Sequence, residues 1–530
     1  MKKMLFMLML LGGTAYAQVS PVLSLESDPH LLDLVCRACA HFQPDALSDD
    51  SPYHLDRATC GTMAIMGLRS NWGRLSPATK TSFSFLLQQR PPTRNASVTS
   101  SSGHFKIHYN TSGLHAVALT DNDGNSIPDY VDETIAAFED SWVKQIDELG
   151  YNPPPSDGDG VYDIYISSLG TQSVYGLTWP LGSDTILPSY IEVDNNFTDA
   201  NVYFTQGLDG LKVTAAHEFF HAIQFGYYAD FNAAWWQEMT ATWMEDVVYP
   251  EINDFYAYVP SRMNDPEASL DFFSGALPFG GAVFSHYVEQ VYGIEAIRNV
   301  WATLLSRSPQ NYSLNEIDSG MPSGGFSGVF PRYTVWNYLT GTRGRPNYYS
   351  EATELSAVKI RDLGVSGSGT GSVSIDHLGA TYVRVGTSGL SGGLRGNFTF
   401  SDTNAFTFVV LLIKANQVEL LWPQSTTVVV PNVNRFDEVV FIPTVTAFDD
   451  DNLRVDYTIS SGVGNSTASD LVADFNSDGN VNFNDFVNFT QGFGVAPRDA
   501  SHNSKLDLDG DGPIDFQDFL LFVSHFGDSK

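Results

Sequence analysis

The segment His217-Glu218-Phe219-Phe220-His221 brings together the side-chain types that a catalytic zinc site needs. It lies in the run LKVTAAHEFFHAIQF, which has helical character, so His217 and His221 would share one helix face. Two imidazoles on one face can bind a single Zn²⁺ ion, and the carboxylate of Glu218 can serve as general base for a zinc-activated water. The spacing therefore predicts a hydrolytic zinc site on a helix.

A catalytic zinc takes three protein ligands and keeps one position open. The run Trp235–Asp246 (WWQEMTATWMED) is also helical in character, and its Glu238 lies 17 positions after His221 (238 − 221). That interval allows a loop and a second helix packed beside the first, so Glu238 is the predicted third ligand. Glu245 lies two helical turns further on and is predicted to orient a ligand imidazole. A solvent-exposed helix end is the alternative for Glu245.

Two later segments have the oxygen spacing of a calcium-binding loop. Each has oxygen ligands at the loop positions that Ca²⁺ uses and Gly at the sixth position, where such loops turn sharply. The loops begin 33 positions apart (507 − 474), and a Phe-rich helical run follows each one. The predicted Ca²⁺ ligands are Asp474, Asn476, Asp478, Asn480, Asn482 and Asp485 in the first loop and Asp507, Asp509, Asp511, Pro513, Asp515 and Asp518 in the second.

A third acidic segment repeats this spacing but has Ser126 where Gly is expected. Its predicted Ca²⁺ ligands are Asp121, Asp123, Asn125, Ile127, Asp129 and Asp132. The alternative is an Asx-rich turn that caps the helix expected from Tyr130. The sequence leaves both interpretations open.

The zinc motif and its surroundings resemble the gluzincin-type metallopeptidases, the thermolysin and aminopeptidase group. In that group HExxH is followed by a glutamate ligand on the next helix, and WWQEMTATWMED is similar to its second motif, Asn/Gln-Glu-x-x-Ala. The resemblance is strongest to a family of exported bacterial metalloproteases and covers roughly residues 100–345, through GHFKIHYNTSG, IPDYVDETIAAFEDSW, YDIYISSLG and AAHEFFHAIQFGYY. It implies a zincin-like fold and hydrolysis of peptide bonds. The interval from His221 to Glu238 is short for the group, and Thr242 stands where thermolysin-like enzymes have a carboxylate.

The paired calcium loops resemble a dockerin module, with Asp instead of Glu at the twelfth position. The resemblance implies a small helical domain that docks onto a cohesin-like partner. Six aromatic side chains at helical spacing would supply its core: Phe486, Phe489, Phe493, Phe519, Phe522 and Phe526. A calcium-stiffened tail without a receptor is the alternative.

The first residues predict an exported protein. Lys2 and Lys3 precede an apolar run from Met4 to Leu11, and Ala15-Tyr16-Ala17 has the form that signal peptidase recognises, so residues 1–17 are the expected signal peptide. The run is too short for a membrane anchor, which needs about 20 apolar residues, and no later stretch predicts a span. We therefore expect a secreted protein, free or associated with the cell surface.

The composition excludes nucleic acid as the expected partner. The formal net charge is −33, from 28 basic and 61 acidic residues, and such an excess repels phosphate. The same charge favours solubility and Ca²⁺ binding. With 43% hydrophobic residues, the chain can bury large cores and is not predicted to be disordered.

A chain of 530 residues predicts several domains. After the signal peptide we expect an N-terminal pro-segment or subdomain over 18–100, an α+β zincin-like metallopeptidase domain over 101–355, an all-β sandwich over 356–460, a polar linker over 461–469 and the paired EF-hand-type dockerin-like module over 470–530. In the domain over 101–355, strands are expected at 105–109, 161–166 and 189–193, and helices at 130–149, 235–247, 281–292 and 295–305. Seven short β-rich runs between 373 and 459 predict the sandwich.

The chain has three cysteines, Cys36, Cys39 and Cys60. In an oxidising compartment one disulfide is expected, joining Cys60 to either of the others. The Cys36-x-x-Cys39 spacing also occurs in redox pairs and half zinc sites, but no second pair follows it at zinc-ribbon spacing.

Three functions compete. The first is a secreted zinc metallopeptidase acting on a protein or peptide substrate, and the second is a non-catalytic extracellular or cell-surface binding protein with a peptidase-like fold. The complete set of His217, Glu218, His221 and Glu238 favours the first. The third is a carbohydrate hydrolase, which needs a pair of positioned carboxylates that the sequence does not identify.

Overall fold

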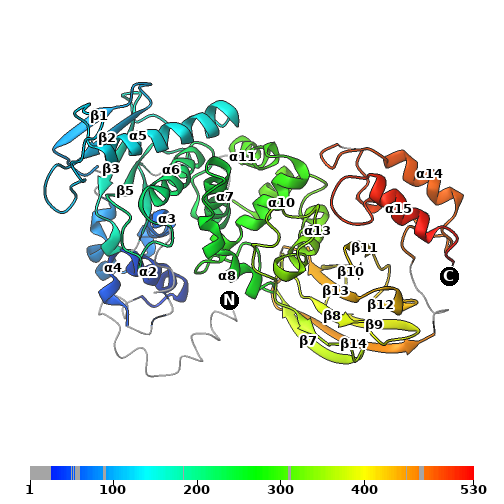
Figure 1. Ribbon diagram of the computed structural model, residues 1–530. Coiled ribbons are helices and arrows are strands. Elements are labelled where there is room, and N and C mark those ends of the chain that lie inside the picture. The colour runs from blue at the N-terminus through cyan, green and yellow to red at the C-terminus, as the bar shows by residue number, and fades with distance from the viewer. Residues whose placement is uncertain are drawn as a thin grey trace. The chain divides into compact units, whose positions relative to one another are not determined.

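The computed structural model shows a multidomain α+β protein with several sheets and helices (Figure 1). It describes residues 26–529 apart from 49–50, 52, 54–59, 88–90, 173, 183, 308–311, 449, 465–470 and 500. The expected signal peptide and most of the expected linker lie outside the described residues. The chain divides into two units: unit 1 comprises residues 1–257, 273–279 and 304–313, and unit 2 comprises 258–272, 280–303 and 314–530. This division does not follow the boundaries expected at residues 100 and 355.

Unit 1 is built on a five-stranded mixed sheet in the order β1-β2-β3-β5-β4. Its strands are β1 (Ala96–Thr99), β2 (Phe105–Tyr109), β3 (Tyr162–Ser167), β4 (Gly176–Pro180) and β5 (Ser189–Asp194). The three central strands are parallel, and β1 and β4 pair antiparallel at the two edges. Residues of β2 alternate between buried and half-buried, as expected for a strand with one face on the core. The strands expected from the sequence are present, whereas the short strands β1 and β4 were not predicted.

Helices α5 (Asp129–Trp142) and α6 (Gly207–Gln224) pack on this sheet, and α7 (Ala234–Val248) packs on α6. Helix α5, extended by the π-helical turn Val143–Glu148, lies between β2 and β3 in the chain, as a parallel strand pair requires. Helices α6 and α7 follow β5 and are joined by a short connection that includes the 3-10 turn Phe231–Ala233. Residues of α7 from Ala234 to Glu245 are all buried, so this helix is covered on every side.

Helices of the N-terminal segment pack into the same unit. They are α2 (Pro29–Phe42), α3 (Thr62–Ser70) and α4 (Pro77–Ser82), with 3-10 turns at Pro44–Ala46, Trp72–Arg74 and Ser84–Leu87. The side chains of Asp28 and Ser76 cap α2 and α4 by accepting backbone N–H groups. Leu31, Leu34 and Leu68 of these helices share an apolar core with Val174 and Leu177, next to and within β4. The segment is therefore folded onto the sheet of unit 1.

Unit 2 combines helices with two sheets. Its helices are α8 (Val259–Asn264), α10 (Ala282–Tyr292), α12 (Leu314–Gly320) and α13 (Phe326–Tyr338), with a 3-10 turn at Gly341–Arg343; α9 (Leu277–Gly280) and α11 (Glu295–Arg307) contain residues of both units. One sheet has the order β11-β10-β13-β8-β6 and the other β12-β9-β14-β7. Both line a single core, in which Val410, Val439 and Phe441 of the first meet Phe398 and Val455 of the second.

The strands of unit 2 are β6 (Arg361–Asp362), β7 (Gly369–Ile375), β8 (Val383–Gly386), β9 (Gly393–Phe400), β10 (Phe406–Lys414), β11 (Gln417–Leu421), β12 (Thr427–Val430), β13 (Glu438–Val445) and β14 (Leu453–Val463), with a 3-10 turn at Val433–Arg435. All seven expected β-rich runs are strands, and β6 and β11 are additional. Strand β14 continues to Val463, so residues 461–463 of the expected linker belong to the sheet.

The segment after 470 forms two short helices, α14 (Phe483–Gly492) and α15 (Phe516–His525), and a 3-10 turn at Ser504–Leu506. Each helix begins with a capping box, in which Asp485 or Asp518 accepts the N-cap backbone N–H. The segment also bonds to the rest of unit 2: the Leu508 carbonyl accepts from Leu420 N at 2.8 Å, and the Gly510 carbonyl accepts from Trp336 Nε1 at 2.9 Å. The segment therefore packs on β11 and α13 of the same unit.

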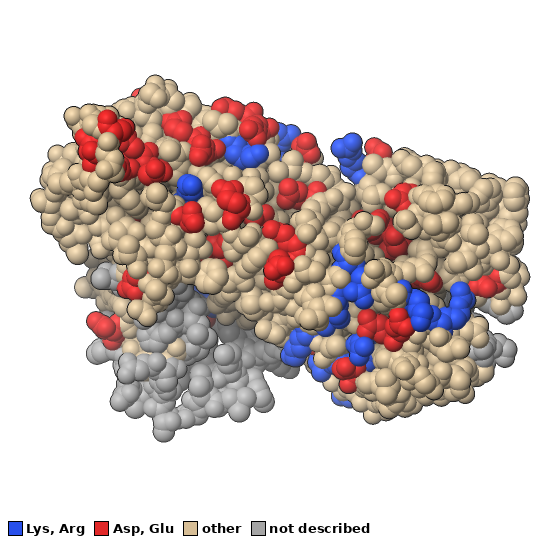
Figure 2. Space-filling view, in the orientation of Figure 1, with Lys and Arg blue, Asp and Glu red and all other residues tan. Residues whose placement is uncertain are grey.

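The surface agrees with the acidic composition. Figure 2 shows acidic side chains gathered over unit 1 with few basic side chains among them. Within the described ranges, no helix has the length and apolar character needed to cross a membrane.

His377 gives unit 2 a pH-dependent stability. Its Nε2 lies 2.8 Å from Asp271 Oδ1 and its Nδ1 lies 2.7 Å from Asp451 Oδ1. Burial lowers the pKa of His377, but hydrogen bonds and charges of the two carboxylates outweigh it and raise the pKa to about 9. Because the folded pKa lies above the ordinary value, the stabilisation is complete below about pH 6.5 and is lost as the pH rises through 9.

We therefore expect His377→Gln to destabilise unit 2 by about 2 kcal/mol at pH 6, after allowing for partial exposure, and by much less at pH 10. Chemical denaturation of both proteins at the two pH values measures the difference. An equal loss at pH 6 and pH 10 would show that the charge of His377 does not stabilise the fold.

Candidate metal centre

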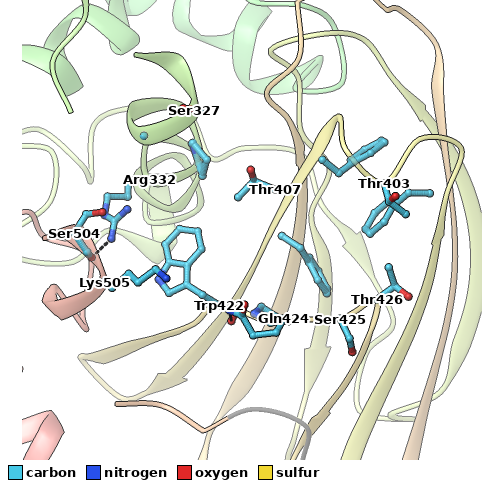
Figure 3. A pocket seen from close by; sticks show the side chains of 16 residues that line it. Ser327, Arg332, Thr403, Thr407, Trp422, Gln424, Ser425, Thr426, Ser504 and Lys505 are labelled. Carbon is cyan, nitrogen blue, oxygen red and sulfur yellow. Dashed lines mark hydrogen bonds between the residues drawn. The ribbon is translucent and has the colours of Figure 1, made fainter. Parts of the chain in front are cut away.

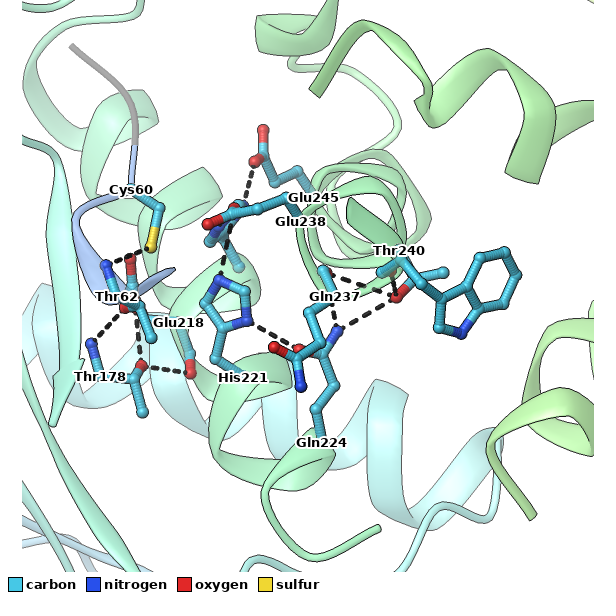
Figure 4. Close-up of polar contacts among 12 residues, drawn as sticks. Cys60, Thr62, Thr178, Glu218, His221, Gln224, Gln237, Glu238, Thr240 and Glu245 are labelled. Atoms are coloured by element: carbon cyan, nitrogen blue, oxygen red, sulfur yellow. Dashed lines mark hydrogen bonds and ion pairs between the residues drawn. The ribbon is translucent and has the colours of Figure 1, made fainter. Parts of the chain in front are cut away.

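Helices α6 and α7 bring the three predicted zinc ligands together (Figure 4). His217 and His221 lie one turn apart on α6, with ring centroids 4.7 Å apart and planes at 84°. Glu238 enters from α7, and its Oε2 lies 3.3 Å from His217 Nε2 and 3.5 Å from His221 Nε2. Ligand atoms held about 2.0–2.1 Å from a tetrahedral zinc lie about 3.3 Å from one another. The observed separations therefore fit a metal between the three side chains.

Contacts on the far side of each ring fix which nitrogen faces Glu238. His217 Nδ1 lies 2.7 Å from Glu245 Oε1, and His221 Nδ1 lies 2.7 Å from Gln224 Oε1. Carboxylate and amide oxygens only accept hydrogen bonds, so each neutral ring carries its proton on Nδ1 and points the Nε2 lone pair at the carboxylate. Lone pairs that face one another in a buried site require a cation between them.

The same atoms have no other hydrogen-bond partner. Across the described residues, His217 Nε2, His221 Nε2 and both oxygens of Glu238 are buried and make no hydrogen bond. His221 and Glu238 have an exposed fraction of 0%. Buried polar atoms without partners are costly, and an ion is one of the few groups that can satisfy all of these at once.

The surrounding charges favour a cation. Burial lowers the pKa of His217, but the nearby carboxylates of Glu238 and Glu245 raise it well above its ordinary value. Burial raises the pKa of Glu245 to about 8. The pKa of Glu238 is lowered, because the charges of the two histidines outweigh burial. Without a metal, protons must supply the positive charge that this cluster requires.

Gln224 was not identified from the sequence, although its position three residues after His221 places it on the same helix face. Its Nε2 donates to Gln237 O at 2.9 Å and to Thr240 Oγ1 at 3.1 Å, so α7 fixes the amide that holds His221. Glu245 was predicted to orient a ligand imidazole, without a choice between the two, and it contacts that of His217.

The predicted general base, Glu218, points toward strand β4. Its Oε2 accepts from Thr178 Oγ1 at 2.6 Å and from Thr62 Oγ1 at 3.2 Å. Gly176 allows this approach, because a Cβ there would lie 2.7 Å from Glu218 Cγ. Neither threonine was identified from the sequence, since both lie on segments distant from the zinc motif.

Cys60 is the fourth residue of the centre. Its sulfur, the ring nitrogens of the two histidines and a Glu238 oxygen all lie within 4.8 Å of one another. Cys36, Cys39 and Cys60 are all free thiols, so the expected disulfide is not formed. Burial, followed by the charges of Glu218 and Glu238, raises the pKa of the Cys60 thiol well above its ordinary value.

Tyr227, Tyr228, His286 and Tyr287 are, by their positions in the sequence alone, the candidate hydrogen-bond donors to a developing oxyanion. The Tyr227 hydroxyl accepts the Asn152 backbone N–H at 3.0 Å, and the Tyr228 hydroxyl lies 3.4 Å from Asp230 Oδ2. His286 and Tyr287, the other two candidates, belong to unit 2.

The two C-terminal loops each gather carboxylates. Asp474, Asp478 and Asp485 form one cluster, and Asp507, Asp509 and Asp511 form the other. Asp485 and Asp518 also accept backbone N–H groups from their own loops. Asn476, Asn480 and Asn482 form hydrogen bonds with neighbouring groups of their loop. No carboxylate cluster of the described residues includes Asp515. Pro513 could bind a cation only through its backbone carbonyl.

The loop from Asp121 behaves differently. Within the described residues, Asp121, Asp123, Asp129 and Asp132 do not form a cluster of three or more converging carboxylates. Asp121 accepts the Gly124 and Ser126 N–H groups, and Asn125 donates to Asp123 and Asp132. Ile127 N donates to the Asn125 side chain at 2.6 Å. These contacts are typical of an Asx-rich turn, the alternative that the sequence left open.

The aromatic side chains of the C-terminal segment divide between core and surface. Phe489 and Phe522 are buried, and Phe486 and Phe519 pack against the cores. Phe493 and Phe526, expected in the core, are 49% and 54% exposed.

A pocket in unit 2 has a volume of about 480 Å³ (Figure 3). Aromatic rings of Phe400, Phe406 and Trp422 line it, and Arg332 lies over the Trp422 ring at 4.9 Å. Its lining residues include Arg332 and Lys505 but no Asp or Glu. The carboxylate pair that a glycoside hydrolase needs is therefore absent from this pocket.

A family model matches the part of the chain that contains the His217–His221 motif. A family of unknown function (DUF6055) matches residues 91–311, which contain the sheet of unit 1 and helices α6 and α7. His217, Glu218, His221 and Glu238 lie within the match, and Cys60 and Thr62 lie before it. No curated protein matches the chain. Over residues 91–311 the chain is thus similar to a family whose function is itself unknown.

Proposed function

We propose that this chain is a secreted zinc-dependent metallopeptidase that hydrolyses protein or peptide substrates. The observation that carries the proposal is the buried convergence of His217 Nε2, His221 Nε2 and Glu238 Oε2 at 3.3–3.5 Å. Two imidazoles and a carboxylate are the donor set of catalytic zinc in thermolysin-like enzymes. The fold that supports it would be a zincin-like domain around the sheet, α6 and α7.

Zinc at these atoms would supply a Lewis acid that polarises the peptide carbonyl and acidifies water. Glu218 neighbours His217 in the helix and is buried, with an exposed fraction of 1%. From that position its carboxylate would take the proton of the attacking water and pass it to the leaving amine. The hydroxyl of Thr178 holds Glu218 Oε2 in place, and Glu245 and Gln224 hold the two ligand rings.

The C-terminal segment is proposed to be a dockerin-like Ca²⁺-binding module that docks onto a cohesin-like partner. Two carboxylate clusters support the Ca²⁺ sites. Exposed apolar side chains at equivalent positions of the two helices support docking: Phe483 and Phe516, Val487 and Leu520, and Phe493 and Phe526.

A second function, a non-catalytic extracellular binding protein, is favoured by one observation. Cys60 adds a fourth protein donor to the set, and structural zinc sites have four protein ligands, whereas catalytic sites keep one position open. The two functions differ in whether the fourth position can be opened.

Metal analysis of the purified full chain tests the proposed site. We expect about one zinc per chain, and less than a tenth of that in His221→Ala, because the variant loses a ligand. His108→Ala, a histidine of strand β2 outside the centre, is the matched control and should keep its zinc. Full zinc content in His221→Ala, or none in the unaltered protein, would contradict the site.

A further inference from the structure

One N-terminal turn, Cys60-Gly61-Thr62, contacts two parts of the candidate metal centre (Figure 4). The Cys60 sulfur lies within 4.8 Å of the donor atoms of the two histidines and Glu238. Two residues later the Thr62 hydroxyl donates to Glu218 Oε2 at 3.2 Å, and the Thr62 backbone N–H donates to Cys60 Sγ at 3.3 Å. The turn therefore contacts both the metal-binding atoms and the general base.

The turn is anchored to strand β4, which is an edge of the sheet. The Thr178 backbone N–H donates to Thr62 Oγ1 at 2.8 Å, and the Arg69 guanidinium donates to the carbonyls of Pro180 and Gly182. Gly61 makes the approach possible, because a Cβ there would lie 2.5 Å from Leu177 Cδ2. An edge strand offers its free N–H and C=O groups to an extended peptide, and here the N-terminal segment uses them.

Little space is left beside the metal-binding atoms. A cavity of about 30 Å³ lies next to Cys60 and Glu238, and helices α2 and α3 form much of its wall through Leu34, Arg37 and Met63. That volume holds about one water molecule. This cavity is too small for a peptide substrate.

Building on the proposed peptidase function, we propose that Cys60 is the fourth zinc ligand of a latent form, and that the N-terminal segment must leave before substrate can bind. The four donors are one sulfur, two nitrogens and one oxygen, which zinc accepts together. On binding, the Cys60 thiol gives its proton to solvent. When the segment leaves, the metal–sulfur bond breaks, the thiolate takes up a proton, and the fourth position opens to water.

The second independent feature is the unpartnered state of the facing atoms. In the described part of the chain, His217 Nε2, His221 Nε2 and the Glu238 oxygens make no hydrogen bond and are buried. They converge on the same point as the Cys60 sulfur. Cys36 and Cys39 are also buried free thiols, but no metal-binding cluster of the described residues includes them.

X-ray absorption at the zinc edge of the unaltered full chain tests the ligand directly and needs no variant. We expect one sulfur at about 2.3 Å together with nitrogen and oxygen neighbours. Cobalt substitution gives a second readout: the full chain should show a thiolate-to-cobalt charge-transfer band, Cys60→Ser should lose it, and the matched control Cys36→Ser should keep it. A shell of only nitrogen and oxygen would overturn the proposal.

Peptidase assays separate this inference from the proposed function. Cys60→Ser should cleave casein at least about tenfold faster than the full chain, because its N-terminal segment is no longer bound to the metal and leaves more readily, which opens the fourth position. Equal activity of the two proteins, without sulfur ligation, overturns latency and leaves the peptidase intact. Sulfur ligation with no activity in Cys60→Ser or after removal of the N-terminal segment overturns latency and supports a closed structural site. Absence of zinc overturns the proposed function itself.

Discussion

Glu218→Gln is expected to lower the turnover of peptide substrates by about 10²–10⁴-fold, the contribution of general acid–base catalysis, without loss of zinc. The amide keeps the shape of the carboxylate but cannot take a proton from water. It can still accept from the Thr178 hydroxyl that holds Glu218 at 2.6 Å, so the local packing should persist. The measurement is turnover together with zinc content, made in the Cys60→Ser background so that latency does not mask the effect.

Glu133→Gln is a suitable control for this experiment. Glu133 is a half-buried carboxylate on α5 of the same unit, outside the metal centre. The control should keep both turnover and zinc. Turnover close to normal in Glu218→Gln, with zinc bound, would show that another group is the base. Loss of zinc together with turnover would show that Glu218 acts on the metal and not on the proton.

The convergence of His217, His221 and Glu238 could be predicted from the sequence because helix geometry is local. The i, i+4 spacing of His217 and His221 determines their shared face, and the seven-residue interval from Glu238 to Glu245 does the same on the next helix. The structure brings these four side chains into contact. Only the packing of α6 beside α7 had to be assumed, and a short connection between two apolar helices makes it the expected arrangement.

The Cys60 and Thr62 contacts could not be predicted in this way. Thr62 meets Glu218 across 156 positions, and nothing local in either segment indicates that meeting. A cysteine in an exported protein also indicates a disulfide before it indicates a metal ligand. Strand β4, which contacts both segments, has the sequence GLTWP. Because Gly and Pro are uncommon in strands, this sequence does not predict a strand.

The acidic loops show where spacing alone is insufficient. Ser126 has φ of 72°, and Gly479 and Gly512 have φ of 86° and 111° at the sixth position of the other two loops. The loop from Asp121 therefore turns in a similar way, although Ser126 must adopt a left-handed backbone conformation that is less favourable for serine than for glycine. Its carboxylates accept backbone and amide N–H groups, as those of the other loops do, but among the described residues they do not converge as a cluster of three. Oxygen spacing predicted the loop, but not the direction of its side chains.

Removal of Ca²⁺ is expected to destabilise unit 2 of the full chain by about 3–4 kcal/mol when the ion had been at 100–1,000 times its dissociation constant. The second loop holds several buried or half-buried carboxylates close together. Burial and mutual repulsion raise the pKa of Asp509 to about 10, that of Asp511 to about 8 and that of Asp518 to about 7. A bound cation removes the repulsion and stabilises the charged form. The measurement is the melting temperature at pH 8 in Ca²⁺ and in EGTA.

The pH dependence distinguishes this cause from a general effect of EGTA. These folded pKa values lie above the ordinary 3.8, so the metal-free protein binds extra protons when folded. In EGTA its stability should therefore fall as the pH rises from 5 to 8, whereas in Ca²⁺ the ion keeps the carboxylates charged and the fall should be absent. Because Leu508 and Gly510 bond to Leu420 and Trp336, the loss should extend beyond the loops into the sheet and α13.

Asp507→Asn should reproduce the effect of EGTA, because it removes a buried ligand, and should make the protein insensitive to the chelator at the second loop. Asp499→Asn, at an exposed residue between the two loops, is the matched control and should melt like the unaltered protein in both conditions. Equal melting temperatures with and without Ca²⁺ at pH 8 would contradict the sites. A change confined to α14 and α15 by hydrogen exchange would show instead that the ion orders the segment without supporting the sheet, in which case its contacts to Leu420 and Trp336 contribute little to stability.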